Sequence, residues 1–168
     1  LIVANHNSHL DALVLVAMLP LRLLFRTRPA ASAEYFLRGR WRAWFATEVI
    51  GIIPVETGGG RPHAEVLGKV RDALAAGNLV IFFPEGTRGE PECLGKLKTG
   101  IVWLAQQLPD VPICPVRLCG LGRVLPKGDW LPVPFFCDAW VGEPLHWEGD
   151  RQRLMAALVA SLGGSPVT

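Results

Sequence analysis

The run from Leu79 to Phe83 limits the possible folds more than any other stretch of the chain. It places five apolar residues in succession, and a strand that is apolar at every position is typically buried on both faces, as in a parallel sheet. A helical pattern precedes this run, between Pro62 and the stop signal Gly77-Asn78. The apolar face of that helix consists of Val66, Leu67, Val70, Ala73 and Leu74.

Strand and helix patterns alternate along the rest of the 168 residues. We expect four further strands, at 1–4, 49–55, 113–118 and 135–141. Further helices are expected at 9–19, 34–45, 98–108 and 150–162. A basic strand or loop is expected at 21–28. This alternation predicts an α/β fold, a layered domain with a largely parallel central sheet flanked by helices.

The length of the chain suits a single domain, residues 1–168, with enough residues for a core. The chain begins without methionine and inside an expected strand. We therefore expect it to be a fragment of a longer protein whose N-terminal region is missing.

Composition narrows the class of protein. The formal net charge is only +2, which disfavours nucleic acid as a partner. No apolar run reaches the roughly 18 to 20 residues that a membrane-spanning helix needs, and the longest candidate is 12–21. Half of the residues are nevertheless hydrophobic and only 19% are charged, so we expect the protein to lie against a membrane.

Basic and aromatic residues gather between Pro20 and Arg42. This stretch has one acid, Glu34, and six arginines: Arg22, Arg26, Arg28, Arg38, Arg40 and Arg42. The interleaved aromatics are Phe25, Tyr35, Phe36, Trp41, Trp44 and Phe45. Such a mixture suits an anionic membrane surface, and the alternative is a solvated basic face over ordinary core aromatics. We expect a location at the cytoplasmic face of a membrane, peripheral or anchored by a segment outside this sequence.

The four cysteines show no disulfide or metal pattern. Cys93, Cys114, Cys119 and Cys137 form no Cys-x-x-Cys pair and no Cys/His ligand spacing. Reduced thiols in the cytosol are the simplest account, and no metal site is expected.

A polar turn, Asn5 to Asp11, separates the first expected strand from the first expected helix. Turns beyond the carboxyl end of a strand are where α/β proteins usually carry catalytic groups. Ser8 fits the N-cap, and Asp11 three residues later completes a pattern like a capping box. With His6 in the loop, its ring can fold back onto the Asp11 carboxylate. A neutral histidine held by a carboxylate is a general base.

Two simpler interpretations of this turn stay open. Asp11 could be only a capping residue and His6 only a loop histidine. His9 competes with His6 as the base, although it is expected to face outward as the first helical residue.

A second polar turn, 83–89, follows the buried strand. In a parallel sheet it emerges at the same edge as the first polar turn, so Glu85 and Arg88 can face the catalytic pair. Gly86 lets a backbone N–H approach a ligand closely, and Arg88 suits bidentate contact with a phosphate. The alternative is an internal Glu85–Arg88 pair that only holds the turn.

Two lysines, Lys96 and Lys98, stand just ahead of the helix expected at 98–108. Their cations could serve an anionic ligand. The alternative is that both lysines face solvent.

The first polar turn resembles the His-x4-Asp signature of the glycerolipid acyltransferases, the lysophosphatidate (1-acylglycerol-3-phosphate) acyltransferase family, with His6 and Asp11 in the matching positions. Residues 83–88 resemble the third block of that family, Phe-Pro-Glu-Gly-Thr-Arg. Residues 51–55 resemble its second block and 111–116 its fourth. The four blocks stand in the order of the family and cover about residues 1 to 120.

The resemblance implies transfer of a fatty acyl group from acyl-CoA or acyl carrier protein to the hydroxyl of a lysophospholipid. The leading acceptor is 1-acylglycerol-3-phosphate, which would give phosphatidic acid. His6 would be the general base and Asp11 its partner, with no metal or other cofactor. The residues expected to contact the acceptor are Ser8, Arg61, Glu85, Gly86, Thr87 and Arg88.

Two positions depart from the family pattern. Thr57 stands where the second block usually ends in an arginine that helps to hold the acceptor phosphate, and Arg61 is the candidate substitute. Gly89 stands where serine is frequent. These departures concern the acceptor, so a phosphate-free lyso-lipid such as a lyso-aminolipid is the alternative acceptor.

Two rival functions belong to other classes. A serine hydrolase would use Ser8 with His6 or His9, but the chain has no Gly-x-Ser-x-Gly elbow. A non-catalytic lipid-binding domain would gain little from a positioned base.

Overall fold

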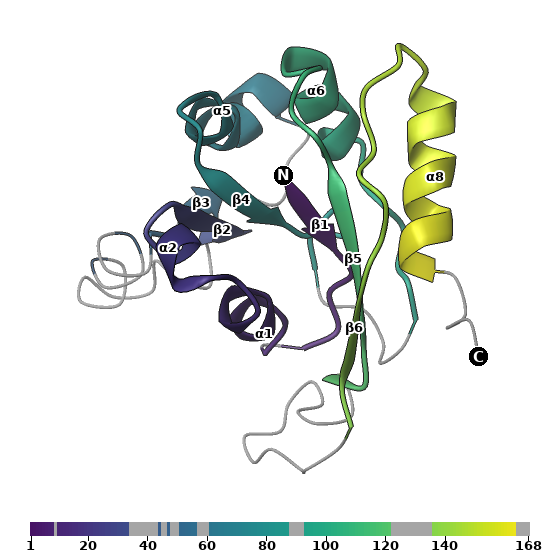
Figure 1. Cartoon of the computed structure of the whole chain (residues 1–168). Coiled ribbons are helices and arrows are strands. Elements are labelled where there is room, and N and C mark those ends of the chain that lie inside the picture. The colour runs from purple at the N-terminus through teal and green to yellow at the C-terminus, as the bar shows by residue number, and fades with distance from the viewer. Residues whose placement is uncertain are drawn as a thin grey trace.

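A central sheet flanked by helices forms the molecule in the computed structural model (Figure 1). The structure describes residues 1–8, 10–33, 44, 47, 51–56, 61–87, 93–121 and 136–163. Within these residues the predicted α/β class is confirmed. The helix predicted at 34–45 lies almost entirely outside them.

The sheet has six strands in the order β3-β2-β4-β1-β5-β6. Their bounds are β1 Ile2–Ala4, β2 Thr27–Ser32, β3 Ile53–Val55, β4 Leu79–Phe82, β5 Cys114–Cys119 and β6 Asp138–Val141. Every pairing among the first five of these strands is parallel, and only β6 is antiparallel to its neighbour β5. The prediction of a largely parallel sheet is therefore confirmed.

Five helices belong to the described residues: α1 Asp11–Ala17, α2 Leu21–Leu24, α5 His63–Ala75, α6 Gly100–Gln107 and α8 Arg151–Gly163. The prediction of a strand or loop at 21–28 was wrong for 21–24, which form α2, and is confirmed for 25–28, which form a turn and the start of β2. A helix of four residues is barely one turn, too short to show a 3.6-residue period in the sequence. The helix predicted at 9–19 is confirmed but shorter at both ends.

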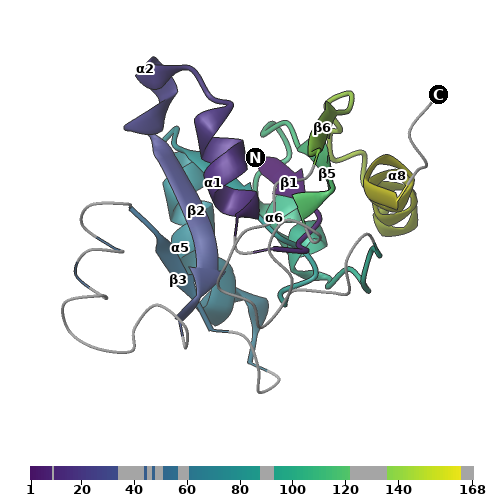
Figure 2. The same ribbon diagram turned by 90° about the horizontal axis from the view of Figure 1, so that it is seen from below.

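Helices cover both faces of the sheet (Figures 1 and 2). On one face, Val3, Val80 and Phe82 pack with side chains of α5, α6 and α8. On the other face, Ala4 and Ile81 pack with Leu15 of α1. Successive strand residues thus enter different cores, which is the reason that β4 is apolar at every position.

The stop predicted at Gly77-Asn78 determines where β4 begins. The N–H of Gly77 donates to the carbonyl of Leu74 at 2.9 Å, and the N–H of Asn78 donates to that of Ala73 at 3.0 Å. These two bonds are the Schellman pattern that closes a helix. The chain then enters β4 directly, at Leu79.

Strands β1 and β4 are parallel neighbours in register, with Ile2 opposite Ile81 and Val3 opposite Phe82. The two polar turns leave these strands at the same edge of the sheet, as predicted. No helix among the described residues is long and apolar enough to cross a membrane.

Candidate active site

Asp11 organises the first polar turn. It is the first residue of α1, and its side chain is fully buried. Its Oδ2 accepts the N–H groups of Asn7 at 2.6 Å and Ser8 at 2.8 Å. The carboxylate therefore fixes the backbone of the turn before it contacts any side chain.

The N-cap predicted at Ser8 was wrong by two residues. The N-cap of α1 is Leu10, and its N–H donates to the Ser8 hydroxyl at 3.3 Å. Half of the capping box is present, because Asp11 reaches back to the N–H of Ser8. The side chain of Ser8 is buried within the turn.

The ring of His6 folds back onto Asp11, as the sequence predicts. Nδ1 of His6 lies 2.9 Å from Oδ2 of Asp11. Because an ionised carboxylate can only accept, Nδ1 is the donor in a bond to that form of Asp11. The ring stacks on Phe83, with centroids 4.3 Å apart and planes 24° apart, and 23% of the side chain is exposed. This arrangement fixes the orientation of the imidazole and uses Nδ1, rather than Nε2, for the contact with Asp11.

Asn5 anchors the turn to the sheet from the other side. Its side-chain amide donates to the carbonyl of Leu118 at 2.8 Å and accepts the N–H of the same residue at 2.7 Å. The side chain thereby replaces a peptide group at the point where β1 leaves β5. This role of Asn5 was not predicted, because nothing near it in the sequence identifies a partner 113 residues away.

Glu85 connects three segments. Its Oε1 accepts the N–H of His6 at 2.7 Å, and its Oε2 accepts the N–H of Gly95 at 2.7 Å. The residue is only 5% exposed. Both carboxylate oxygens are occupied by the backbone, so Glu85 holds the turn after β1 and the segment before α6 against the turn after β4.

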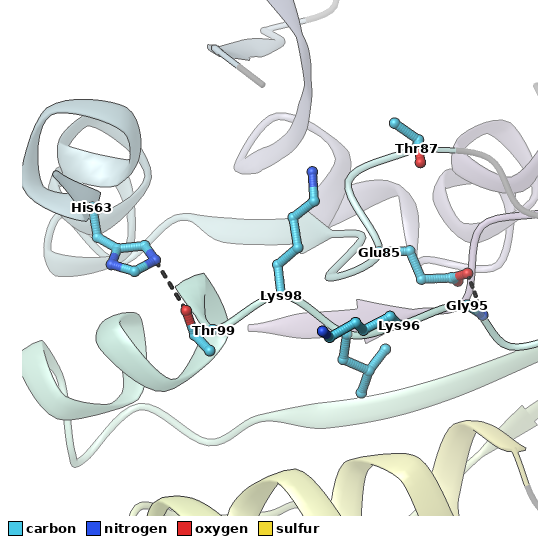
Figure 3. Close-up of a pocket in the computed structure, with 8 residues that line it drawn as sticks. His63, Glu85, Thr87, Gly95, Lys96, Lys98 and Thr99 are labelled. Carbon is cyan, nitrogen blue, oxygen red and sulfur yellow. Dashed lines mark hydrogen bonds between the residues drawn. The ribbon is translucent and has the colours of Figure 1, made fainter. Parts of the chain in front are cut away.

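A cavity of about 580 Å³ opens beside Glu85. Figure 3 shows that its walls come from the start of α5, the turn after β4 and the segment entering α6. His63 and Thr99 meet across it, with Nε2 and Oγ1 3.3 Å apart. The lining residues are His63, Glu85, Thr87, Gly95, Lys96, Leu97, Lys98 and Thr99. Lys96 and Lys98, for which the sequence left either an anionic ligand or solvent open, both line the cavity and are both exposed.

The other predicted site residues are divided between the cavity and elsewhere. Thr87 lines the cavity, and Gly86 has a φ of +72° in the turn beside it. Arg61 lies outside the lining and pairs with Glu56, both side chains being more than half exposed. Predictions for Arg88, His9 and Thr57 fall outside the described residues. Within the described ranges, no group of three or more His, Cys, Asp or Glu side chains could hold a metal ion.

Comparison with known proteins gives a consistent result. A family model described as Acyltransferase matches residues 1–119. A chloroplastic 1-acyl-sn-glycerol-3-phosphate acyltransferase of Brassica napus is 32% identical over 126 residues, which are 75% of this chain and 34% of that protein. The alpha form of the same enzyme from Bos taurus is 31% identical over 99% of this chain and 56% of its own length.

A solved structure shares the fold. The 1-acyl-sn-glycerophosphate acyltransferase PlsC of Thermotoga maritima superposes with a TM-score of 0.71 and 21% identity, over 94% of this chain and 60% of that one. The chain spans about a third of the length of the chloroplast relative and somewhat more than half of the bovine one.

The contact between Glu85 and Gly95 can be tested through stability. A Cβ at Gly95 would lie 2.6 Å from Oε2 of Glu85, so Gly95→Ala must shift the carboxylate away from the part-buried N–H groups of His6 and Gly95. We expect a loss of about 1–3 kcal/mol in the free energy of unfolding, measured by denaturant titration.

Gly68→Ala in α5 is the matched control. No atom lies within 4 Å of a Cβ built there, and alanine favours a helix over glycine by about 0.5–1 kcal/mol. The control should be as stable as the parent or slightly more so. Equal stability of the two variants would contradict the bridging role of Glu85.

Proposed function

We propose that this chain, which belongs to the acyltransferase family, moves a fatty acyl group from a thioester donor to the free hydroxyl of a lysophospholipid. The observation that carries the proposal is the contact between Nδ1 of His6 and Oδ2 of Asp11. The donor would be acyl-CoA or acyl carrier protein. The leading acceptor is 1-acylglycerol-3-phosphate, with phosphatidic acid as the product.

His6 would act as the general base. Its Nε2 takes the proton of the acceptor hydroxyl while the oxygen attacks the thioester carbonyl. The tetrahedral intermediate then collapses, the C–S bond breaks, and the thiolate recovers the proton from the imidazolium. The products are an ester and a free thiol, so no metal or redox cofactor enters the balance.

Asp11 would stabilise the imidazolium that forms on His6. Among the described residues it makes no ion pair with lysine or arginine. The imidazolium of His6 would therefore be the first cation in contact with the Asp11 carboxylate. Because that carboxylate is buried, the attraction between the two charges is stronger than in water. The N–H groups of Asn7 and Ser8 are engaged by Asp11, so stabilisation of the oxyanion falls to other donors.

The rival functions receive less support. Ser8 is 1% exposed and its hydroxyl accepts a backbone N–H, which is a poor arrangement for a nucleophile. A purely lipid-binding domain has no use for an imidazole oriented by a buried carboxylate. The phosphate-free acceptor is favoured only by Thr57, and it remains the second candidate.

We also propose that the protein works at an anionic membrane surface. Consecutive helices α1 and α2 lie side by side in both views (Figures 1 and 2). Four exposed apolar side chains stand in these helices or directly after them, and we term them the α1–α2 patch: Leu13 at 64%, Met18 at 48%, Leu21 at 80% and Phe25 at 87%.

The charges around the α1–α2 patch match such a surface. Arg22 and Arg26 are exposed within it, and the sequence has no acid between Asp11 and Glu34. Apolar side chains that enter the headgroup region beside arginines are typical of interfacial binding. Phe25 is too exposed to be a core aromatic. Most of the aromatics between 34 and 45 lie outside the described residues. Cys93, Cys114 and Cys119 are free thiols, and the cytoplasmic face is the location that we propose.

The base can be tested in the full-length protein. We expect His6→Ala to lower the rate of acyl transfer to lysophosphatidate by about 10²- to 10⁴-fold, because a positioned base contributes that factor. The measurement follows radiolabelled acyl-CoA into phosphatidic acid, with acyl carrier protein as the second donor. His146→Ala, an exposed histidine distant in sequence, is the control. Equal rates for the two variants would refute the assignment of His6.

Membrane binding can be tested by flotation with vesicles. Phe25→Ser should weaken partitioning onto vesicles rich in phosphatidylglycerol by about 10- to 100-fold, since a buried phenylalanine contributes about 1.5–3 kcal/mol. Val141→Ser on the edge strand β6 removes another exposed apolar side chain, 67% exposed, and should change nothing. If both variants float like the parent protein, the α1–α2 patch is not the membrane-binding surface.

A further inference from the structure

The side chain of Lys98 crosses the second polar turn. The N–H of Lys98 donates to the carbonyl of Pro84 at 2.8 Å, which fixes the segment before α6 against that turn. A Cβ built at Gly86 would lie 2.6 Å from Nζ and 3.0 Å from Cε of Lys98. The ammonium group therefore occupies the space that a side chain at position 86 would fill.

Gly86 meets two requirements at this point. Its φ of +72° is a conformation that other residues rarely adopt, and its missing side chain leaves room for Lys98. Gly86 was predicted to let a backbone N–H approach a ligand closely. In the structure that N–H donates to the carbonyl of Phe83 at 3.1 Å, and the Lys98 side chain lies over the glycine. Figure 3 shows this side chain rising from the floor of the cavity between Thr87 and His63.

Among the residues that the structure describes, no carboxylate neutralises the charge on Lys98. Within the described ranges no carboxylate lies within 4.0 Å of its ammonium group. Glu85 is the one carboxylate among the described residues of the wall, and both of its oxygens accept backbone N–H groups. Hydroxyls of Thr87 and Thr99 stand in the same wall. A cation with hydroxyl neighbours in a cavity of this size suits a phosphate group.

We propose that Lys98 binds the phosphate of the acceptor. It would replace the arginine that the family usually has at the position of Thr57. The inference rests on the proposed acyl transfer and names its acceptor class, a lysophospholipid with a phosphomonoester head group. Arg61, the other candidate for this part, is paired with Glu56 away from the cavity.

The position of the cavity favours the acceptor over the donor as the source of the phosphate. Glu85 lines the cavity and also accepts the backbone N–H of His6, so one side chain joins the cavity wall to the turn that carries the proposed base. In 1-acylglycerol-3-phosphate the attacking hydroxyl and the phosphate sit on adjacent carbons of one glycerol. In an acyl-CoA or acyl carrier protein, the pantetheine arm separates the thioester from the nearest phosphate.

The test is steady-state kinetics on the full-length protein, with lysophosphatidate and with a monoacylglycerol that lacks the phosphate. For Lys98→Met we expect kcat/KM for lysophosphatidate to fall about 10- to 100-fold, the range for a lost hydrogen bond to a charged group. The KM for the acyl donor and the rate with monoacylglycerol should not change. Lys98→Arg should recover most of the loss. Lys69→Met, which removes an exposed lysine of α5 outside the cavity wall, should match the parent.

Three outcomes would overturn the assignment. The first is an unchanged kcat/KM for lysophosphatidate in Lys98→Met. The second is a rise in the donor KM alone, which would assign the cavity to the phosphate of the donor. The third is an equal loss with both acceptors, which would point to general damage, checked by the thermal unfolding of the variant.

A parent protein that transfers acyl groups to neither acceptor would refute the proposed function instead. Calorimetric titration with glycerol 3-phosphate would then still decide the role of Lys98. Binding by the parent that is lost in Lys98→Met supports the phosphate site, and binding unaffected by the substitution refutes it.

Discussion

The candidate site depends on the hydrogen bonds that the buried carboxylate of Glu85 accepts. Strands β1 and β4 bring the two polar turns to one edge of the sheet, but strand pairing ends at Val3 and Phe82. Beyond that point the hydrogen bonds from Glu85 to the N–H groups of His6 and Gly95 hold the segments together. Hydrogen bonds to a charged acceptor are among the stronger ones in proteins. The position of the base and the shape of the cavity therefore depend on the same side chain.

The two buried carboxylates at this edge of the sheet, those of Asp11 and Glu85, have different roles. Each accepts two backbone N–H groups, but only Asp11 also contacts the imidazole. The contact with Asp11 fixes the orientation of the His6 ring, and the hydrogen bonds of Glu85 fix where His6 stands. Phe83 supports the ring from one face. The ring is therefore held before any substrate arrives, which is the preorganisation that the proposed general-base catalysis requires.

Local patterns in the sequence predicted the alternation of strands and helices, and the contact of His6 with Asp11, because these features depend on residues close together in the chain. Contacts set by the order of the strands could not be predicted in this way. The bond from Asn5 to Leu118 spans 113 residues, and the bond from His6 to Glu85 spans 79. Glu85 was expected to face a ligand. Its backbone N–H partners could not be predicted, because its neighbours in the sequence do not indicate them. In the sequence Lys98 is one of two lysines just ahead of a helix. Only the structure distinguishes it from the other, by placing its side chain over Gly86.

Helix α1 links the proposed chemistry to the proposed membrane surface. Asp11 begins the helix, and Met18 of the α1–α2 patch follows its last residue. Leu13 of the same patch lies only two residues after Asp11, and the seven residues of the helix span about 10 Å. The α1–α2 patch and the turn that carries His6 therefore lie within the length of one short helix. A lysophospholipid whose acyl chain stays in a bilayer bound by this patch would have only that distance to cover with its glycerol hydroxyl.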